Sequence, residues 1–213
     1  MTPAYGGGMP PDPLGTVEAV HAFPVKSLRA GPLATIELDA AGVAGDRRFA
    51  VVDRDGVLTA DAAPRLRDVV AAIGPDGAPL VRVPGTGGVG VGGAQADAAL
   101  SGFLGRPVRL APVPAGSTLD APVHLVSRQA LDAAARGEHD AAHCACSLEE
   151  PRANLVLDLP GLREEQLVGR RLTVGTAVLR IVRRPNHCLG VYAEVEQPGC
   201  VGPGDVLQEE PDA

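Results

Sequence analysis

The 213-residue chain contains no tryptophan, and aromatic residues make up only 2% of it. So few aromatic side chains offer little surface on which bases could stack, which disfavours a single-strand nucleic-acid binder. The 26 acidic residues outnumber the 19 basic ones, and the net charge of −7 argues against a general basic field for nucleic acid. Both deficits predict a protein without a nucleic-acid partner.

Long apolar runs are also missing, because no stretch approaches the ~20 residues needed to span a bilayer. The first residues show neither the basic start nor the apolar segment of a secretory signal. The four cysteines, without an export signal, do not indicate a disulfide framework. We therefore expect a cytoplasmic protein with no membrane partner, whose cysteines are either reduced core residues or chemically active.

Lysine is nearly absent, since 18 of the 19 basic residues are arginine and one is Lys26. Asparagine occurs only twice, at Asn154 and Asn186. Lysine is a compact point charge whereas arginine is a planar fork, so a tight anion site can require lysine specifically. Lys26 is either a surface lysine that has been retained by chance or an anion-binding residue.

Short alternating or β-branched runs, separated by turn residues, dominate the chain. The strands that they predict cover residues 17–25, 33–38, 48–52, 57–59, 78–83, 154–158, 171–174, 177–182 and 191–195. Many short strands with few helices indicate a mainly β fold, a β-barrel with a few inserted helices. Residues 1–15, rich in glycine and proline, are interpreted as a disordered tail.

Helical composition is confined to residues 94–104 and 127–136. Ser127 is predicted to be the N-cap of the second helix, and Gly137 is predicted to end it. The glycine-rich segment 85–93 lacks a following Lys-Ser/Thr, so we interpret it as a flexible strand–turn segment rather than a phosphate-binding loop.

Six motif-like segments follow one another along the chain: FPVKS at 23–27, GDRRF at 45–49, PVHLVS at 122–127, RAN at 152–154, NHCL at 186–189 and GPGDV at 202–206. In this order and spacing they closely resemble the MOSC family, the molybdenum cofactor sulfurase C-terminal domain, with its N-terminal β-barrel partner. Enzyme members of that family include the mitochondrial amidoxime-reducing component and its bacterial relatives. The resemblance implies a MOSC N-terminal domain over residues 16–112 and a MOSC domain over 113–213, the two halves intertwined.

The resemblance also implies a molybdenum cofactor site between the two halves. By this resemblance, the cofactor-binding residues are Lys26, Ser27, Arg47, Arg152 and Asn154. Cys188 corresponds to the cysteine that ligates molybdenum and acts in catalysis. A looser association of the family is with pyridoxal phosphate.

Residue chemistry agrees with such a site. A molybdopterin is a dithiolene with an anionic phosphate, so its pocket requires fixed cations and hydrogen-bond donors. Molybdenum is soft enough to take a thiolate, and nearby cations keep that sulfur deprotonated. Arg183, Arg184 and His187 surround Cys188 in the sequence and would lower its pKa if they face it.

Two motif positions depart from the family pattern. His187 precedes Cys188 where many enzyme members have arginine, and the family's R-P-N is here Arg152-Ala153-Asn154, preceded by Pro151. These departures weaken the prediction of the substrate, and to a lesser degree that of catalytic activity, more than the prediction of cofactor binding.

The leading hypothesis is a molybdenum cofactor-dependent oxidoreductase that reduces N-hydroxylated small molecules. No cysteine spacing suits an iron–sulfur cluster, so its electrons would come from an external electron-transfer protein or reductase. The alternative is a sulfur-carrier or molybdenum cofactor-carrier protein, in which Cys188 holds a persulfide or hands the cofactor to a client. A third possibility is a degenerate barrel that serves only protein contacts.

Several residues also have simpler interpretations. Cys188 could be an inert buried thiol, and Arg47 could be a surface ion-pair partner. Asp46 more naturally fixes a turn or pairs with arginine than acts as an acid. Cys144 and Cys146, near His139 and His143, form a loop or redox-sensitive pair more readily than a zinc site. Ser127 and His124 suggest a hydrolase only superficially, because no G-x-S-x-G elbow is present.

Overall fold

The structure is a computed structural model that describes residues 12–113, 121–138, 151–186 and 188–210. It is mainly β, with one closed barrel, three small sheets and two α-helices in the described residues. The predicted fold class is therefore confirmed. None of the described helices is long and apolar enough to cross a membrane.

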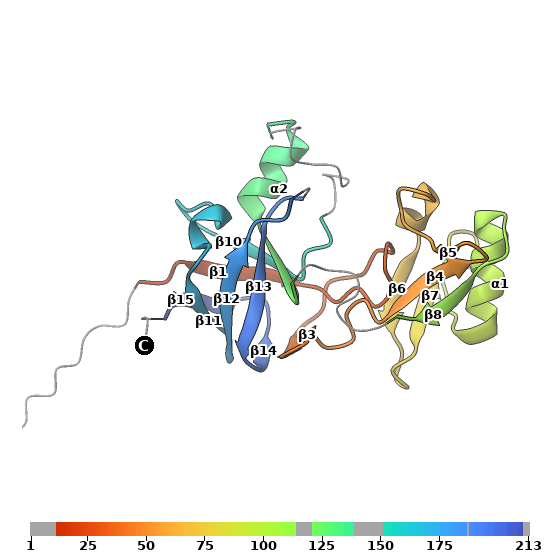
Figure 1. The fold of residues 1–213 in the computed structure, drawn as a ribbon, viewed down its shortest axis with the longest axis horizontal. Coiled ribbons are helices and arrows are strands. Elements are labelled where there is room, and N and C mark those ends of the chain that lie inside the picture. The colour runs from red at the N-terminus through yellow and green to blue at the C-terminus, as the bar shows by residue number, and fades with distance from the viewer. Residues whose placement is uncertain (1–11, 114–120, 139–150, 187, 211–213) are drawn as a thin grey trace, which may run out of the picture.

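The barrel closes through seven strands, taken from both ends of the chain (Figure 1). In spatial order they are β1 (Gly15–Val20), β10 (Leu155–Asp158), β9 (Val123–Ser127), β13 (Val191–Gln197), β12 (Ala177–Arg183), β11 (Arg171–Val174) and β15 (Val206–Glu209). β9 and β10 run parallel and the other neighbours antiparallel. Inward-facing Val, Leu and Ile side chains fill the interior, as expected for a small barrel.

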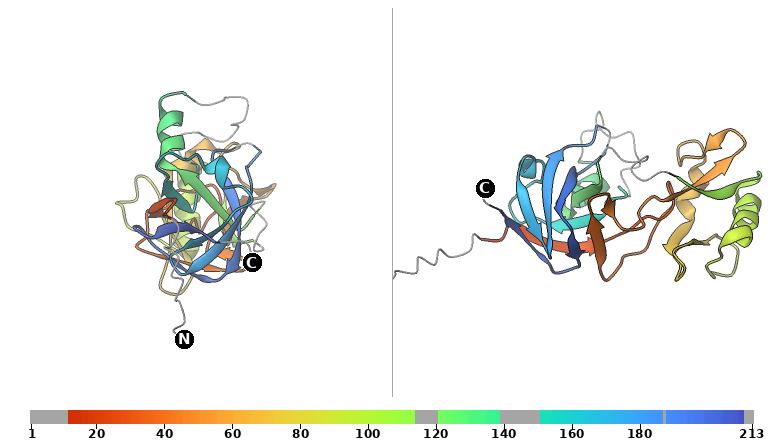
Figure 2. Two further views of the ribbon diagram at one scale, coloured as in Figure 1. Left: turned by 90° about the vertical axis from the view of Figure 1, so that its left-hand side faces the viewer. Right: turned by 60° about the horizontal axis from the view of Figure 1, so that its bottom comes forward.

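Three small sheets come from the first half of the chain, with one strand from near its end. They are β14-β2-β3, β5-β4-β8 and β6-β7. Their strands are β2 (Ile36–Asp39), β3 (Gly42–Val43), β4 (Phe49–Asp53), β5 (Gly56–Val57), β6 (Val70–Ile73), β7 (Pro79–Arg82), β8 (Arg109–Pro112) and β14 (Gly199–Val201). A second apolar core unites β4, β6, β7 and helix α1 (Gly93–Leu104), apart from the barrel core. Figures 1 and 2 show the barrel at one side and the α1-bearing sheets at the other.

Helix α2 (Arg128–Ala135) follows β9 directly, as the sequence predicts. The Ser127 hydroxyl accepts a hydrogen bond from the Ala130 N–H at 3.0 Å, which caps the helix. Gly137 then adopts a φ of 72°, so the predicted stop is also confirmed. Two short 3-10 helices, Pro64–Asp68 and Glu164–Leu167, were not predicted.

The first predicted strand is shorter than expected. β1 ends at Val20, and the residues that follow bond to β4 instead: Lys26 N–H donates to Phe49 O at 2.8 Å, and Phe49 N–H donates to Pro24 O at 3.0 Å. The strand thus gives way to a segment that crosses from the barrel to the α1-bearing sheets.

The tail predicted over residues 1–15 lies mostly outside the described residues. Its end belongs to the barrel, because Leu14 N–H donates to Leu207 O at 2.9 Å and Gly15 begins β1. A domain boundary near residue 113 stays a prediction. β1, β2 and β3 precede that position, yet they contribute Val17, Ile36 and Val43 to the barrel core.

Candidate functional site

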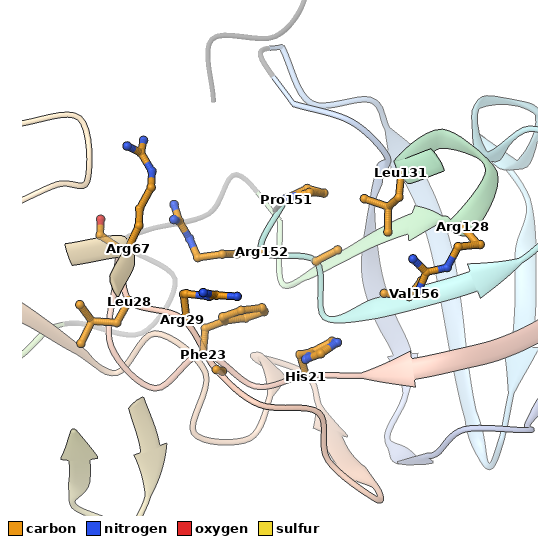
Figure 3. A pocket seen from close by; sticks show the side chains of 13 residues that line it. His21, Phe23, Leu28, Arg29, Arg67, Arg128, Leu131, Pro151, Arg152 and Val156 are labelled. Atoms are coloured by element: carbon orange, nitrogen blue, oxygen red, sulfur yellow. The ribbon is translucent and has the colours of Figure 1, made fainter. Parts of the chain in front are cut away.

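A cavity of about 340 Å³ lies between the crossing segment that follows β1, the start of α2 and the segment that leads into β10 (Figure 3). This size falls within the usual range for small-molecule pockets. Its lining residues are His21, Phe23, Ser27, Leu28, Arg29, Ala30, Arg67, Arg128, Leu131, Pro151, Arg152, Ala153 and Val156. Segments far apart in the sequence therefore form one concave surface.

The lining is strongly cationic. Arg29, Arg67, Arg128 and Arg152 contribute guanidinium groups, and no carboxylate residue is among the described residues that line the cavity. The whole chain carries a net charge of −7, so this concentration of positive charge is local. Such a cavity attracts an anion and can bind it through charge-assisted hydrogen bonds.

The FPVKS segment places its serine in the cavity wall. Ser27 has a φ of 68° and is only 3% exposed, so the backbone turns sharply immediately after Lys26. Lys26 is half-buried and is not among the lining residues. Ser27 thus lines the cavity and Lys26 does not, and contact of either residue with a cofactor stays a prediction.

The GDR segment forms a buried ion pair behind the cavity. The Arg47 side chain bonds the Asp46 carboxylate, donates to Arg152 O at 2.6 Å and has its guanidinium 5.3 Å from the centre of the Phe23 ring. Asp46 also accepts from Phe23 N–H at 2.6 Å. The expectation that Asp46 pairs with arginine is confirmed. Arg47 is buried rather than on the surface, and it holds two cavity residues, Phe23 and Arg152, in place.

Asn154 is fully buried at the start of β10 and links three segments. Its side-chain oxygen accepts from His124 N–H at 3.1 Å, and its side-chain nitrogen donates to His21 O at 3.2 Å. Its backbone N–H donates to His124 O at 2.7 Å. The side chain therefore fixes the segment that carries His21, while its predicted contact with a cofactor stays a prediction.

His124 is a buried histidine on β9 that contacts both Asn154 and the turn that carries Cys188. Its ring Nε2 donates to Leu189 O at 2.7 Å, and its ring packs edge-on against Tyr192 with centroids 5.1 Å apart. The pKa of His124 is lowered to about 4, mainly because the ring is buried. The hydrogen bond to Leu189 raises this pKa, and the charges of Arg47 and Arg152 lower it. The ring is therefore neutral at pH 7.

This buried histidine makes a pH prediction. His124 binds a proton near pH 6.5 when the chain is unfolded but only near pH 4 when folded, so stability is lost as the pH falls through that window. We expect the unfolding free energy to lose about 3 kcal/mol between pH 7 and pH 4 from this residue. Denaturant titrations at pH 7 and pH 4 measure the difference in unfolding free energy between the wild type and His124→Gln. This difference should shrink by about 3 kcal/mol from pH 7 to pH 4. A difference that is the same at both pH values would contradict the lowered pKa of His124.

Cys188 is half-buried on the turn between β12 and β13. The adjacent Leu189 packs against Val126, Ala153 and Val156, two of which line the cavity. The hydrogen bond from His124 to Leu189 O fixes the same turn. Cys188 is thus carried on a turn packed against the cavity wall.

The cations predicted around Cys188 have other contacts. Arg183 lies with its guanidinium 5.4 Å from the centre of the Tyr192 ring, and Arg184 is 3.6 Å from the Glu165 carboxylate. Asn186 is exposed, and His187 lies outside the described residues. These contacts are with groups other than the Cys188 sulfur, so a lowering of the Cys188 pKa by Arg183 and Arg184 stays a prediction.

The hydrolase interpretation finds no support in the contacts of its serine. The Ser127 hydroxyl donates to the buried Glu164 carboxylate and caps α2. His139, His143, Cys144 and Cys146 lie outside the described residues. Within the described residues, no group of three or more His, Cys, Asp or Glu side chains could hold a metal ion.

Sequence reasoning missed much of the cavity wall. His21, Phe23, Arg29, Arg67 and Arg128 line it, and none was singled out as a site residue. His21 and Phe23 stack with centroids 5.8 Å apart and form one side of the cavity. Burial lowers the pKa of His21, against a hydrogen bond with the Gly31 backbone. The one signal in the sequence was position, because Phe23 is the first residue of the FPVKS segment and His21 lies two residues before it.

Parts of the chain are similar to known proteins. Residues 14–112 match the family model described as the MOSC N-terminal beta barrel domain. A search of curated proteins finds no match. Among solved structures, the crystal structure of the YuaD protein from Bacillus subtilis is similar at 14% identity and a TM-score of 0.48, covering 93% of this chain and 97% of that one.

Proposed function

Residues 14–112 of this chain belong to the family of MOSC N-terminal beta barrel domains, and on that premise we propose that the protein binds a molybdenum cofactor in the arginine-lined cavity. The reaction that we propose is reduction of N-hydroxylated compounds with electrons from an external donor. Proteins with MOSC domains are often associated with this cofactor, and the chemistry of the cavity agrees with it.

The observation that carries the proposal is the composition of the cavity wall. Four guanidinium groups line the cavity and no carboxylate residue is among the described lining residues, although Arg128 is paired with Glu18 and Arg67 with the exposed Asp61. Such a wall suits a ligand that bears a phosphate. Three buried side-chain polar atoms of the described residues have no hydrogen-bond partner, and two of them, His21 Nδ1 and Arg67 Nε, belong to lining residues. An unpaired buried polar group costs about 1–3 kcal/mol, so a polar ligand here recovers stability.

The chemical groups of these residues, as well as their charge, suit the cofactor. Arg152 and Ser27 supply donors for the phosphate, and the stacked His21 and Phe23 rings supply a flat wall for the pterin. Cys188 would supply the thiolate ligand. It does not line the cavity itself, but the adjacent Leu189 packs against the cluster that contains the lining residues Ala153 and Val156. Arg47 and Asn154 act from behind by holding Arg152, Phe23 and His21 in place.

The proposed reaction converts an N–OH group into N–H and water, and consumes two electrons and two protons. When bound, the cofactor supplies the two-electron chemistry, and the protein supplies binding, orientation and electrostatics. Apolar residues Leu131, Ala153 and Val156 exclude water beside the Cys188 turn. The guanidinium groups orient the bound molecules. The electrons come from a separate electron-transfer protein or reductase.

The test uses protein produced in a host that makes molybdopterin. With a chemically reduced viologen dye as donor and no oxygen present, the protein should convert an amidoxime into its amidine, with two electrons consumed per product. Arg152→Gln should lower the activity at least about tenfold, because a cofactor contact is lost. Arg136→Gln, at an exposed ion pair beyond α2, is the matched control and should change little.

A carrier function would give a different result in the same preparation. A carrier that holds a persulfide adds the mass of sulfur to Cys188 and reduces no amidoxime. Intact-mass spectrometry of the wild type therefore separates the two functions. A protein that shows added sulfur, no molybdenum and no reduction contradicts the proposed reaction.

A further inference from the structure

The turn between β12 and β13, which carries Cys188, ends on a glycine that lies directly against β9. Gly190 has a φ of 93°, and a Cβ atom at this position would be 2.1 Å from Leu125 O and 3.0 Å from His124 Nε2. These distances leave no room for a side chain, and the backbone conformation also favours glycine. The turn therefore comes closer to β9 than another residue at position 190 would allow.

His124 contacts this turn from β9. Its ring Nε2 donates to Leu189 O at 2.7 Å, and that carbonyl belongs to the residue immediately after Cys188. The Leu189 side chain packs against a small apolar cluster that includes Val126, two residues after His124 on the same strand. The residue next to Cys188 is thus held by β9 through both its carbonyl and its side chain.

The His124 ring is itself held in one orientation. The residue is only 3% exposed, and its ring packs edge-on against Tyr192 on the paired strand β13. Its backbone N–H donates to the Asn154 side chain at 3.1 Å, and its backbone O accepts from Asn154 N–H at 2.7 Å. A donor fixed on every side can hold the turn in one position.

The ring also lies beside the segment that carries Arg152. The Arg152 backbone is within hydrogen-bonding reach of the ring, and Arg152 O accepts from the Arg47 side chain at 2.6 Å. Arg152 lines the cavity. One buried side chain therefore contacts both the Cys188 turn and a segment of the cavity wall.

We infer that His124 is a positioning residue, which holds the Cys188 turn against the cavity wall through Leu189 O and so presents the sulfur in one orientation. His124 is not among the described residues that line the cavity, so it acts through the turn and not on a bound molecule. The inference rests on the proposed function, since it names a residue that determines how the thiolate meets the cofactor. Loss of such an indirect contact typically changes metal affinity or activity by about 10- to 100-fold.

The test compares two substitutions of similar length. The side-chain amide of His124→Gln can donate to Leu189 O in place of Nε2, whereas His124→Met has no donor. In protein from a host that makes molybdopterin, electron paramagnetic resonance of Mo(V) reports the atoms bound to the metal. The g values of His124→Gln should match the wild type, and those of His124→Met should shift or split. His124→Met should also lower the kcat for amidoxime at least about tenfold, with KM changed less than about twofold.

A second readout needs no cofactor. In the full chain from a host that lacks molybdopterin, peptide mass spectrometry follows the alkylation of Cys188 by iodoacetamide, with the exposed Cys200 as the reference in the same sample. His124→Met should raise the rate at Cys188 relative to Cys200 at least about threefold, because the turn opens more often. His124→Gln should leave this ratio unchanged.

A barrel-core substitution separates positioning from general stability. Val174 is fully buried on β11, which pairs with β12 and β15 and not with β9. Val174→Ala should lower the thermal midpoint and leave both the Mo(V) signal and the alkylation ratio unchanged. If His124→Met does not fold, His124→Asn replaces it, because an amide one methylene shorter does not reach Leu189 O.

Each outcome has a definite meaning. An unchanged Mo(V) signal in His124→Met overturns the inference, and where the two readouts disagree the signal decides. A His124→Gln protein as impaired as His124→Met, or an equal change in Val174→Ala, also overturns it, because the hydrogen bond is then not the cause. A wild type without molybdenum, whose Cys188 alkylation still depends on a donor at position 124, refutes the proposed reaction and leaves the positioning of Cys188 by His124 standing.

Discussion

Replacing Cys188 by serine is expected to lower the molybdenum content at least about tenfold and to abolish amidoxime reduction, because the soft thiolate ligand is lost. The thermal midpoint should stay close to that of the wild type, since the side chain is half-buried on a turn and serine is of similar size. Elemental analysis, a melting curve and the viologen assay measure the three quantities on one preparation.

Cys200→Ser is the matched control for this substitution. Cys200 is exposed on β14 and its backbone N–H bonds Thr176, so its thiol has no part in the proposed site. The control should keep both metal and activity. A Cys188→Ser protein that retains metal and activity equally well would show that the sulfur of Cys188 is not a metal ligand.

Arg47→Met is expected to destabilise the fold by about 3 kcal/mol, because it leaves the Asp46 carboxylate buried without its charge partner. It also removes the donor to Arg152 O and the cation from the Phe23 ring. Methionine is unbranched and similar in length, so the loss of charge and hydrogen bonds dominates. Chemical denaturation at pH 7 measures the change.

Arg54→Met provides the control for Arg47→Met. Arg54 also pairs with an adjacent aspartate, Asp55, but both side chains are largely exposed, so its loss should cost less than about 0.5 kcal/mol. Adding Asp46→Asn to Arg47→Met should recover part of the stability, because the unpaired charge is removed. Equal costs for Arg47→Met and Arg54→Met would contradict the structural role given to Arg47.

Local signals in the sequence predicted the elements that local interactions determine. The Ser127 cap and Gly137 stop bound α2, and strand β11 occupies the predicted residues 171–174. The first strand was predicted too long, since residues after Val20 leave the barrel to pair with β4. That pairing is a long-range contact, which alternation within residues 17–25 does not encode.

The residues of the candidate site also fall into two groups, those that the sequence predicted and those that it could not predict. Motif order predicted Ser27 and Arg152, which line the cavity, and Cys188, which lies on a turn packed against its wall. Arg29 and Arg67 could not be predicted, because an isolated arginine in a chain with 18 of them carries no distinguishing signal. Long-range hydrogen bonds between Arg29 and the Val69–Ala71 backbone help to bring their segments together, and no local pattern encodes them.

The proposed function requires a molybdenum cofactor in the arginine-lined cavity. The most direct measurement is the content of molybdenum and pterin per chain in the purified wild type, expressed in a host that makes molybdopterin. We expect close to one of each per chain. Soluble, folded protein that contains neither would contradict the account.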